Sequence, residues 1–196
     1  FILMEFISQS RASFNYWEEL GRSLAALHRN TAADFGLDHN NYIGSLPQSN
    51  AKSASWHEFF VNQRLEPQIK LLGASTQLRK RFNSLLTRIP QIFPAEPPAL
   101  LHGDLWSGNL IRDGSGGPCL IDPAVYYGNR EMELAFTQLF GGFDHRFYDT
   151  YKEVFPLHPG FDERADICNL YPLLVHANLF GGHYMLEIED IFSRWA

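Results

Sequence analysis

Apolar side chains recur every three or four residues along much of the chain, the interval that gathers them on one face of a helix. Trp17, Leu20 and Leu24 carry this pattern in residues 15–29 and predict an amphipathic helix there. The same interval predicts further helices over residues 56–72, 75–89, 131–140, 146–155, 162–180 and 184–195. Pro67 is expected to bend the first of these, because proline lacks the N–H that continues a helix. Most of the chain is therefore predicted to be helical.

Only a few segments have the composition of strands. Residues 110–112 and 119–121 are short apolar runs on either side of the glycine-rich residues 113–117, which predicts two strands joined by a turn. Residues 99–101 form another short apolar run after a proline-rich segment. Together with the helices, these runs predict an α+β fold, a mainly helical body with a small β-hairpin set into it.

The chain opens with an apolar run over residues 1–7, of the kind found in buried strands, and it begins with Phe1 rather than methionine. A free terminus inside a buried strand would leave backbone groups and apolar side chains without cover. We therefore expect further residues to precede Phe1 in a longer parent protein.

The composition is that of a folded globular protein. Of the 196 residues, 45% are hydrophobic and 19% are charged, which excludes wholesale disorder and fits one domain or large lobe. A net charge of −6 without an arginine-rich block argues against a nucleic-acid partner. The two cysteines, Cys119 and Cys168, are too few for a disulfide framework and are typical of a reducing compartment. No apolar run approaches the roughly 20 residues that cross a bilayer, so we expect a cytoplasmic protein without a membrane partner.

Two polar segments flank the predicted hairpin: HGDLWSGN at residues 102–109 precedes it, and IDP at residues 121–123 follows it. The hairpin would fold Asp122 back towards Asn109, close to Asp104. Phosphoryl transfer needs such a set, with one carboxylate to orient and deprotonate the attacking hydroxyl, and an amide and a second carboxylate to hold Mg²⁺ against nucleotide phosphates. Carboxylate and amide oxygens suit Mg²⁺. The sequence therefore predicts phosphoryl transfer from a nucleotide with the help of Mg²⁺; ATP as that nucleotide is implied by the family resemblance described below.

Each piece of this set has a simpler structural interpretation when taken alone. HGD is a common tripeptide, DP is usually a turn, and an asparagine before a glycine-rich hairpin is often turn chemistry. Their order and spacing together favour the phosphotransferase. A metal-dependent hydrolase that uses His102, Asp104 and Asp122 is a weaker alternative, because it would have a single histidine ligand and would leave Asn109 unexplained.

These segments resemble the fructosamine/ketosamine-3-kinase family, within the aminoglycoside-phosphotransferase-like branch of the protein-kinase fold. The resemblance runs over nearly the whole chain and is carried by MEF at 4–6, LAALHR at 24–29, HGDLWSGN at 102–109, IDPAVYYG at 121–128 and NLFGG at 178–182. It implies a protein-kinase-like C-terminal lobe with a hairpin that carries the catalytic and metal loops.

The resemblance also implies roles for individual side chains. Asp104 would be the catalytic base for the substrate hydroxyl, and Asn109 and Asp122 would be the Mg²⁺ ligands. Glu133 would brace the backbone of the catalytic loop, and His102 would support that loop rather than take part in the chemistry.

The family pattern divides the chain into two parts. Residues 1–7 correspond to a hinge strand, in which Met4, Glu5 and Phe6 would bind the adenine edge through backbone groups, and residues 8–196 correspond to the helical C-terminal lobe. The family's N-terminal ATP lobe, with its glycine-rich loop, strand lysine and helix glutamate, has no counterpart in the 196 residues.

Other side chains have two interpretations each. Trp106 would either form a platform for the substrate or pack in the core. Arg112 and Arg130 would either steer phosphate or be solvated on the surface. Residues 44–50, inside a long predicted loop over residues 30–54, would either reach the acceptor or form a surface excursion. Six aromatic residues at helical spacing are predicted to lie in the core: Trp17, Phe59, Phe60, Phe136, Phe140 and Tyr171.

The function that the resemblance implies is ATP-dependent phosphorylation of a sugar hydroxyl of a ketosamine, free or bound to protein, in deglycation. One alternative keeps the chemistry and changes the acceptor to an aminoglycoside, choline or another amino-bearing small molecule, since an acidic cleft would suit any cationic acceptor. Another is a non-catalytic lobe that binds a partner. The sequence indicates no oligomeric state.

We expect the 196-residue chain alone to show little or no turnover, because half of the nucleotide cleft and the phosphate-binding cation would be missing. The measurement is ADP release from this chain beside that from the longer parent protein. A robust kinase rate from the 196 residues alone would contradict the expectation.

Overall fold

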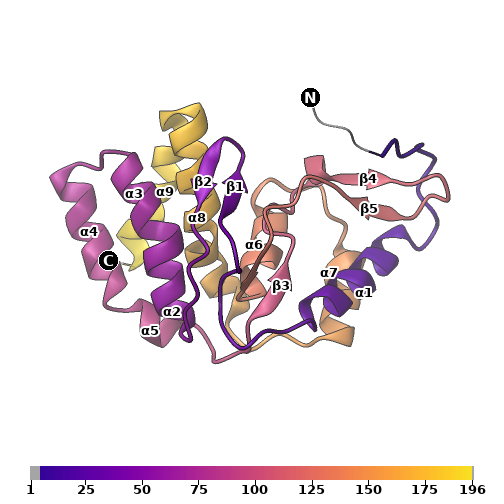
Figure 1. The fold of residues 1–196 in the computed structure, drawn as a ribbon, viewed down its shortest axis with the longest axis horizontal. Coiled ribbons are helices and arrows are strands. Elements are labelled where there is room, and N and C mark those ends of the chain that lie inside the picture. The colour runs from indigo at the N-terminus through magenta and orange to yellow at the C-terminus, as the bar shows by residue number, and fades with distance from the viewer. Residues whose placement is uncertain (1–4, 196) are drawn as a thin grey trace.

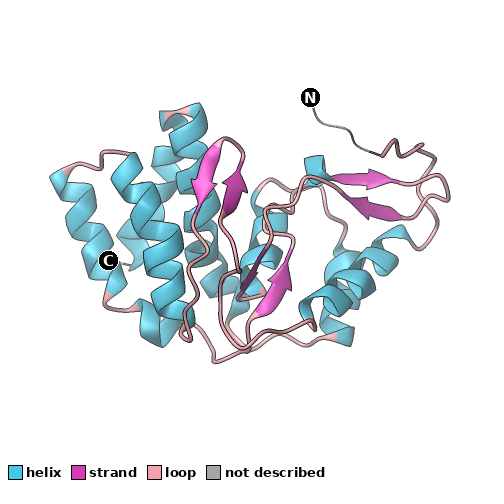
Figure 2. Ribbon diagram, viewed as in Figure 1, coloured by secondary structure: helices cyan, strands magenta, loops and turns pink. Residues whose placement is uncertain are grey.

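The computed structural model describes residues 5–195 and is mainly helical, with strands in short pairs (Figures 1 and 2). The helices are α1 Tyr16–His28, α2 Trp56–Phe59, α3 Glu66–Leu71, α4 Thr76–Leu86, α5 Ile89–Ile92, α6 Glu131–Leu139, α7 His145–Val154, α8 Phe161–Phe180 and α9 Met185–Trp195. A π-helical segment, Phe60–Leu65, joins α2 to α3, and 3₁₀ turns occupy Ser107–Asn109 and Gly182–Tyr184. The predicted α+β class with a predominance of helix is confirmed.

The strands form three antiparallel pairs in the described part of the chain. They are β1 Asn41–Ile43 with β2 Leu46–Gln48, β3 Ala99–Leu101 with β6 Tyr126–Gly128, and β4 Leu110–Arg112 with β5 Pro118–Leu120. The pair β4–β5 is the predicted hairpin, with its second strand starting one residue earlier than expected. The pair β1–β2 lies inside the predicted loop over residues 30–54, and the sequence analysis missed it together with β6. Strands of three residues are too short to show an alternating pattern.

The helices gather on two sides of the strands (Figure 1). On one side α8 packs against α3, α6 and α9, and α9 packs against α4. On the other side α1 packs against α7 and touches β3 and β5. Beyond its charged first turn, α8 is buried around most of its circumference, as expected for a helix whose remaining sequence is largely apolar. None of the helices within residues 5–195 has the length and apolar character needed to cross a membrane.

The predicted helix over residues 56–72 is helical throughout, but it is not a bent α-helix. Its middle turn is π-helical, and Pro67 stands in the first turn of α3, where its missing N–H does not interrupt the helix. The predicted helix over residues 75–89 is too long, because α4 ends at Leu86 and α5 begins at Ile89.

The structure describes only residues 5–7 of the predicted hinge strand over residues 1–7. Residues 1–4, which include Met4, lie outside the described residues. Glu5 and Phe6 are exposed and belong to no strand. Adenine binding by this segment stays a prediction.

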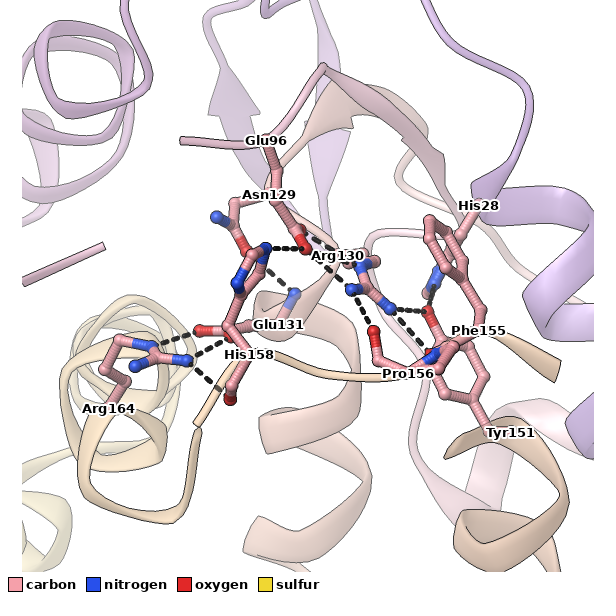
Figure 3. A network of polar contacts seen from close by, with 10 residues as sticks. All are labelled: His28, Glu96, Asn129, Arg130, Glu131, Tyr151, Phe155, Pro156, His158 and Arg164. Carbon is pink, nitrogen blue, oxygen red and sulfur yellow. Dashed lines mark hydrogen bonds and ion pairs between the residues drawn. The ribbon is translucent and has the colours of Figure 1, made fainter. Parts of the chain in front are cut away.

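Arg130 is buried in a polar network, so the interpretation of a solvated surface arginine is wrong, and its guanidinium is occupied by protein partners rather than free to steer phosphate. Its guanidinium is 3% exposed and forms an ion pair with Glu96 at 2.6 Å (Figure 3). It also donates hydrogen bonds to the backbone carbonyls of Phe155 at 2.9 Å and Pro156 at 2.7 Å. These bonds tie the segment before β3 to the end of α7. Arg112 is exposed at the end of β4.

We predict that Arg130→Ala lowers the free energy of unfolding by about 3–5 kcal/mol, because it removes the guanidinium from the buried Glu96 carboxylate and leaves only the half-exposed His158, 3.3 Å away. Urea unfolding of the protein measures the change. Arg79→Ala is the control, since its ion pair with Glu66 is much more exposed than that of Arg130 with Glu96, with side chains 41% and 31% exposed, and such a pair is worth about 1 kcal/mol or less. Equal losses in the two variants would contradict the prediction.

Candidate functional site

The loop that carries Asp104 leaves β3 through a sharp turn at Gly103. Gly103 has a φ of +84°, and a Cβ at this position would lie 2.1 Å from the carbonyl oxygen of Ala124. Only glycine fits a left-handed position with the backbone this close. The Ala124 N–H in turn donates to the His102 carbonyl at 2.8 Å. The turn therefore packs the start of the catalytic loop directly on the segment that follows Asp122.

The carboxylate of Glu133, near the start of α6, holds the backbone of this loop. One oxygen accepts the Gly103 N–H at 2.7 Å, and the other accepts the His102 N–H at 3.1 Å and His28 Nε2 at 2.8 Å. The predicted bracing role of Glu133 is confirmed. Burial raises the pKa of Glu133, but the hydrogen bond from His28 and that from the Gly103 backbone help to outweigh burial, and the pKa lies below its ordinary value.

A chain of buried hydrogen bonds extends from Glu133 through His28. His28 Nε2 donates to the carboxylate, and His28 Nδ1 forms a hydrogen bond with the Tyr151 hydroxyl at 2.7 Å. That hydroxyl accepts Arg130 at 3.4 Å (Figure 3). The catalytic loop is thereby connected through buried polar groups to α1 and α7.

His102 joins the catalytic loop to the metal loop, as the resemblance implied. Its Nδ1 accepts the Asp104 N–H at 3.3 Å, so the proton lies on Nε2, which donates to the Ile121 carbonyl at 3.0 Å. The Ile121 N–H donates to the Asn109 carbonyl at 3.0 Å and extends the β4–β5 ladder by one step. Asp122 follows directly and has a φ of +54°, a conformation that few residues other than glycine adopt.

Asp104, Asn109 and Asp122 line one cavity of about 480 Å³. Asn109 Nδ2 donates to the backbone carbonyl and to Oδ2 of Asp104, both at 2.9 Å. Both partners only accept hydrogen bonds, so the orientation of the amide is determined, and its Oδ1 remains available. The structure therefore brings together the three residues that the sequence singled out.

The donor set fits Mg²⁺ rather than a metal enclosed by protein. Asn109 Oδ1 and the exposed Asp122 carboxylate are hard oxygen donors, and Mg²⁺ commonly takes one or two such ligands and completes its shell with water and phosphate oxygens. Within residues 5–195, no group of three or more histidine, cysteine, aspartate or glutamate side chains could hold a metal ion.

The environment of Asp104 suits a base. Burial raises its pKa to about 7, the hydrogen bond from Asn109 opposes this change, and the charges of Asp122 and Glu133 add to it. A carboxylate with a proton affinity near neutrality can take a proton from a hydroxyl more readily than an ordinary aspartate can.

The side of the cavity away from the metal loop is aromatic. Trp106 is 40% exposed and lines the cavity, which supports the platform interpretation over core packing. Phe140 was predicted to lie in the core, but it is 39% exposed and its ring meets that of Trp106 edge-on at 6.4 Å. It follows the last residue of α6, where the helix emerges from the core. Phe59, Phe60, Phe136 and Tyr171 are buried as predicted, and Trp17 is partly buried against the core.

Sequence reasoning missed the contribution of α8 and the chain after it. His176, Phe180 and Tyr184 line the same cavity. His176 and Phe180 lie four residues apart on α8, which was a usable signal for a shared helix face, whereas Tyr184 lies in the 3₁₀ turn beyond Gly181. The largely apolar second half of α8 concealed which face meets the cavity.

The β1–β2 hairpin closes another side of the cavity with Ile43 and Gly44, so part of the predicted loop has a place at the site. Gln48 holds the hairpin: its Nε2 donates to the Ala124 carbonyl at 3.1 Å, and its Oε1 accepts the Tyr171 hydroxyl at 2.7 Å. The hairpin is thus bonded to the segment after Asp122 and to α8.

Arg64, in the π-helical segment, binds the residues that directly follow the β1–β2 hairpin. Its fully buried guanidinium donates to the Ser49 carbonyl at 2.6 Å and to Asn50 Oδ1 at 2.7 Å. The guanidinium carbon lies 4.0 Å from the ring centroid of Tyr126 and 4.6 Å from that of Phe59. These aromatic faces stabilise the buried positive charge through cation–π interactions.

The fold and the convergent loops define the class of protein. The structure resembles that of the aminoglycoside phosphotransferase APH(4)-Ia with a TM-score of 0.52, over 92% of this chain and 64% of that chain. At 14% identity the likeness shows a kinase-like fold and nothing more. The model of the fructosamine kinase family matches residues 1–195, and the chain belongs to this family.

Individual relatives are similar over the same length. A crystal structure of a provisionally assigned fructosamine-3-kinase from Thermobifida fusca is 35% identical and matches with a TM-score of 0.90, over 97% of this chain and 68% of that one. A provisionally assigned ketoamine kinase of Enterococcus faecium is 39% identical over 201 residues, and a chloroplastic protein-ribulosamine 3-kinase of Oryza sativa subsp. japonica is 40% identical over 202. The chain spans 72% and 58% of the lengths of these two relatives.

We predict that Glu133→Gln destabilises the protein by about 3 kcal/mol near neutral pH, because the amide would turn a donor towards backbone N–H groups. The folded-state pKa of Glu133 is depressed, so its stabilisation is present above the pKa of the unfolded chain and is lost as the pH falls through the folded-state pKa. The difference between wild type and variant should therefore shrink in acid.

Urea unfolding at a series of pH values measures this difference. Glu163→Gln, the same change on an exposed side chain of α8, should leave stability nearly unchanged at every pH. A Glu133→Gln variant as stable as the wild type, or a difference that persists unchanged at low pH, would refute the assigned role.

Proposed function

We propose that the protein transfers the γ-phosphoryl group of ATP to a sugar hydroxyl of a ketosamine. The observation that carries the proposal is the convergence of Asp104, Asn109 and Asp122 on one cavity in a chain of the fructosamine kinase family. Because the chain spans part of the length of its relatives, the proposal concerns the natural full-length protein.

In this reaction Asp104 accepts a hydrogen bond from the acceptor hydroxyl and takes its proton as the hydroxyl oxygen attacks the γ-phosphorus. The bond from the γ-phosphorus to the β–γ bridging oxygen breaks, and ADP leaves with the electron pair. The Asn109 amide keeps the carboxylate aimed at the cavity. The raised pKa of Asp104 suits it to hold the transferred proton until the product leaves.

Asn109 and Asp122 would hold Mg²⁺ through Oδ1 and a carboxylate oxygen. When bound, the ion supplies positive charge that offsets the charge of the nucleotide phosphates. The left-handed backbone at Asp122 and the ladder step from Ile121 to Asn109 fix the backbone that carries the two side chains, which line the same cavity. This rigid placement supports the metal-binding role, because it is established before any ligand arrives.

The acceptor class is supported by the relatives and by the cavity. The names of the relatives are ketoamine kinase and protein-ribulosamine 3-kinase. Bounded by Trp106, Phe140 and the β1–β2 hairpin, the cavity has room for a sugar beside Asp104. No described feature favours an aminoglycoside or choline over a ketosamine, and the intact set of three polar side chains speaks against a non-catalytic lobe.

The ketosamine is a free metabolite or a sugar adduct on a protein, and its phosphorylation would serve deglycation. We place the reaction in the cytoplasm, which the free thiols of Cys119 and Cys168 and the use of ATP both favour.

We predict that Asp104→Asn in the full-length protein lowers kcat for a ribulose-lysine or fructose-lysine acceptor about 10³-fold, because the amide cannot take the hydroxyl proton. The KM for ATP should change little. Asp149→Asn, the same change on an exposed carboxylate of α7, should keep the wild-type rate. Coupled measurement of ADP release gives both constants, and an undiminished kcat in Asp104→Asn would exclude the proposed base.

A further inference from the structure

The side of the cavity lined by Phe140, His176, Phe180 and Tyr184, which we call the acceptor side, carries no carboxylate. Among the described residues that line the cavity, the charged ones are Asp104 and Asp122, which the proposed reaction already uses. The expectation of an acidic cleft for a cationic acceptor therefore does not hold on this side. The cavity nevertheless belongs to a protein whose proposed substrates carry an amine next to the sugar.

Aromatic rings take the place of acidic groups. Phe140 contacts Trp106 on one side and His176 on the other, and the ring centroids of Phe140 and His176 lie 4.8 Å apart. The ring centroid of His176 lies 5.5 Å from that of Phe180 and 5.2 Å from that of Tyr184. Phe180 is 63% exposed, and Phe140 and Trp106 are each about 40% exposed. These rings line the same cavity as Asp104.

His176 adds no positive charge to this wall. Its Nδ1 lies 2.7 Å from the Pro172 carbonyl, which only accepts, so Nδ1 carries a proton and Nε2 is left as an acceptor. Burial lowers the pKa of His176, and the nearby His183 lowers it further, against the opposing effect of the Pro172 hydrogen bond. An ammonium group in the cavity therefore meets a neutral imidazole.

We propose that the exposed rings of Trp106, Phe140 and Phe180 form a subsite for the ammonium group of the acceptor and bind it through cation–π interactions. The inference rests on the proposed function and makes it more specific: it selects acceptors whose amine is alkylated and charged. Aromatic faces attract a cation without carrying a net charge. A carboxylate in their place would bind the ammonium but would also repel the phosphoryl group that is transferred a short distance away.

The experiment uses the full-length protein and two acceptors, a 1-deoxy-1-alkylamino-fructose, which is charged at pH 7, and its N-acetylated form, which is neutral. Phe180→Leu keeps an apolar side chain and removes the ring. Because Phe180 is at the surface, the variant should fold normally, and Phe140→Leu provides a second test. Phe14→Leu is the matched control, the same change at an exposed phenylalanine that does not line the cavity.

We expect Phe180→Leu to raise the KM for the charged acceptor about tenfold, with little change in the KM for the neutral acceptor or for ATP. Phe14→Leu should change none of these constants. Equal effects on the two acceptors, or no effect, would overturn the subsite, since the ring would then contribute only apolar contact.

Calorimetric binding of the two acceptors separates this inference from the proposed reaction. Binding that depends on the ammonium charge and is lost in Phe180→Leu would uphold the subsite even if no phosphorylated product formed, and the proposed reaction would then fail alone. Phosphorylation of both acceptors with no charge-dependent binding would retain the reaction and reject the subsite.

Discussion

The buried carboxylate of Glu133 is the contact on which the site depends. It accepts the backbone N–H groups of His102 and Gly103, and these two residues aim Asp104 into the cavity. A charge at this depth is stable only because every partner is a donor. His28 is one of those donors and is itself held by Tyr151, so α1 and α7 contribute to the catalytic loop without reaching the cavity.

A second set of contacts keeps the metal loop in register with the catalytic loop. His102 bonds the Ile121 carbonyl, and the Ala124 N–H bonds the His102 carbonyl, so the residues on both sides of Asp122 are attached to the turn before Asp104. Gln48 then joins the β1–β2 hairpin to the same segment. The catalytic loop, the metal loop and the β1–β2 hairpin are thereby joined by hydrogen bonds to backbone carbonyls. A continuous sheet does not join them, because the strands are only three residues long.

The polar oxygen atoms and the aromatic rings that line the cavity lie on different sides of it. Carboxylate and amide oxygens gather on the side of the hairpin, where a metal and phosphates would be placed, whereas neutral aromatic groups line the side of α8. Because the rings carry no net charge, this side of the cavity adds no further negative charge near the phosphoryl group that is transferred. This arrangement also explains why the exposed rings of Phe140 and Phe180 persist at the surface: both are part of a cavity wall, and neither is a defect of the core.

The sequence by itself determined the helical content, the β4–β5 hairpin, the family resemblance and the trio of Asp104, Asn109 and Asp122, because helical periodicity and the residues of a tight hairpin are local properties. Only the tertiary structure decided the buried role of Arg130, the β1–β2 hairpin and the aromatic wall. The sequence around Arg130 does not indicate whether its side chain is solvated or buried in an ion pair, because its partner Glu96 lies 34 residues away in the chain. Phe140 looks like a core residue in a helical pattern until the packing of α6 against α8 leaves it at the cavity. Such outcomes depend on contacts between distant segments, which no local pattern records.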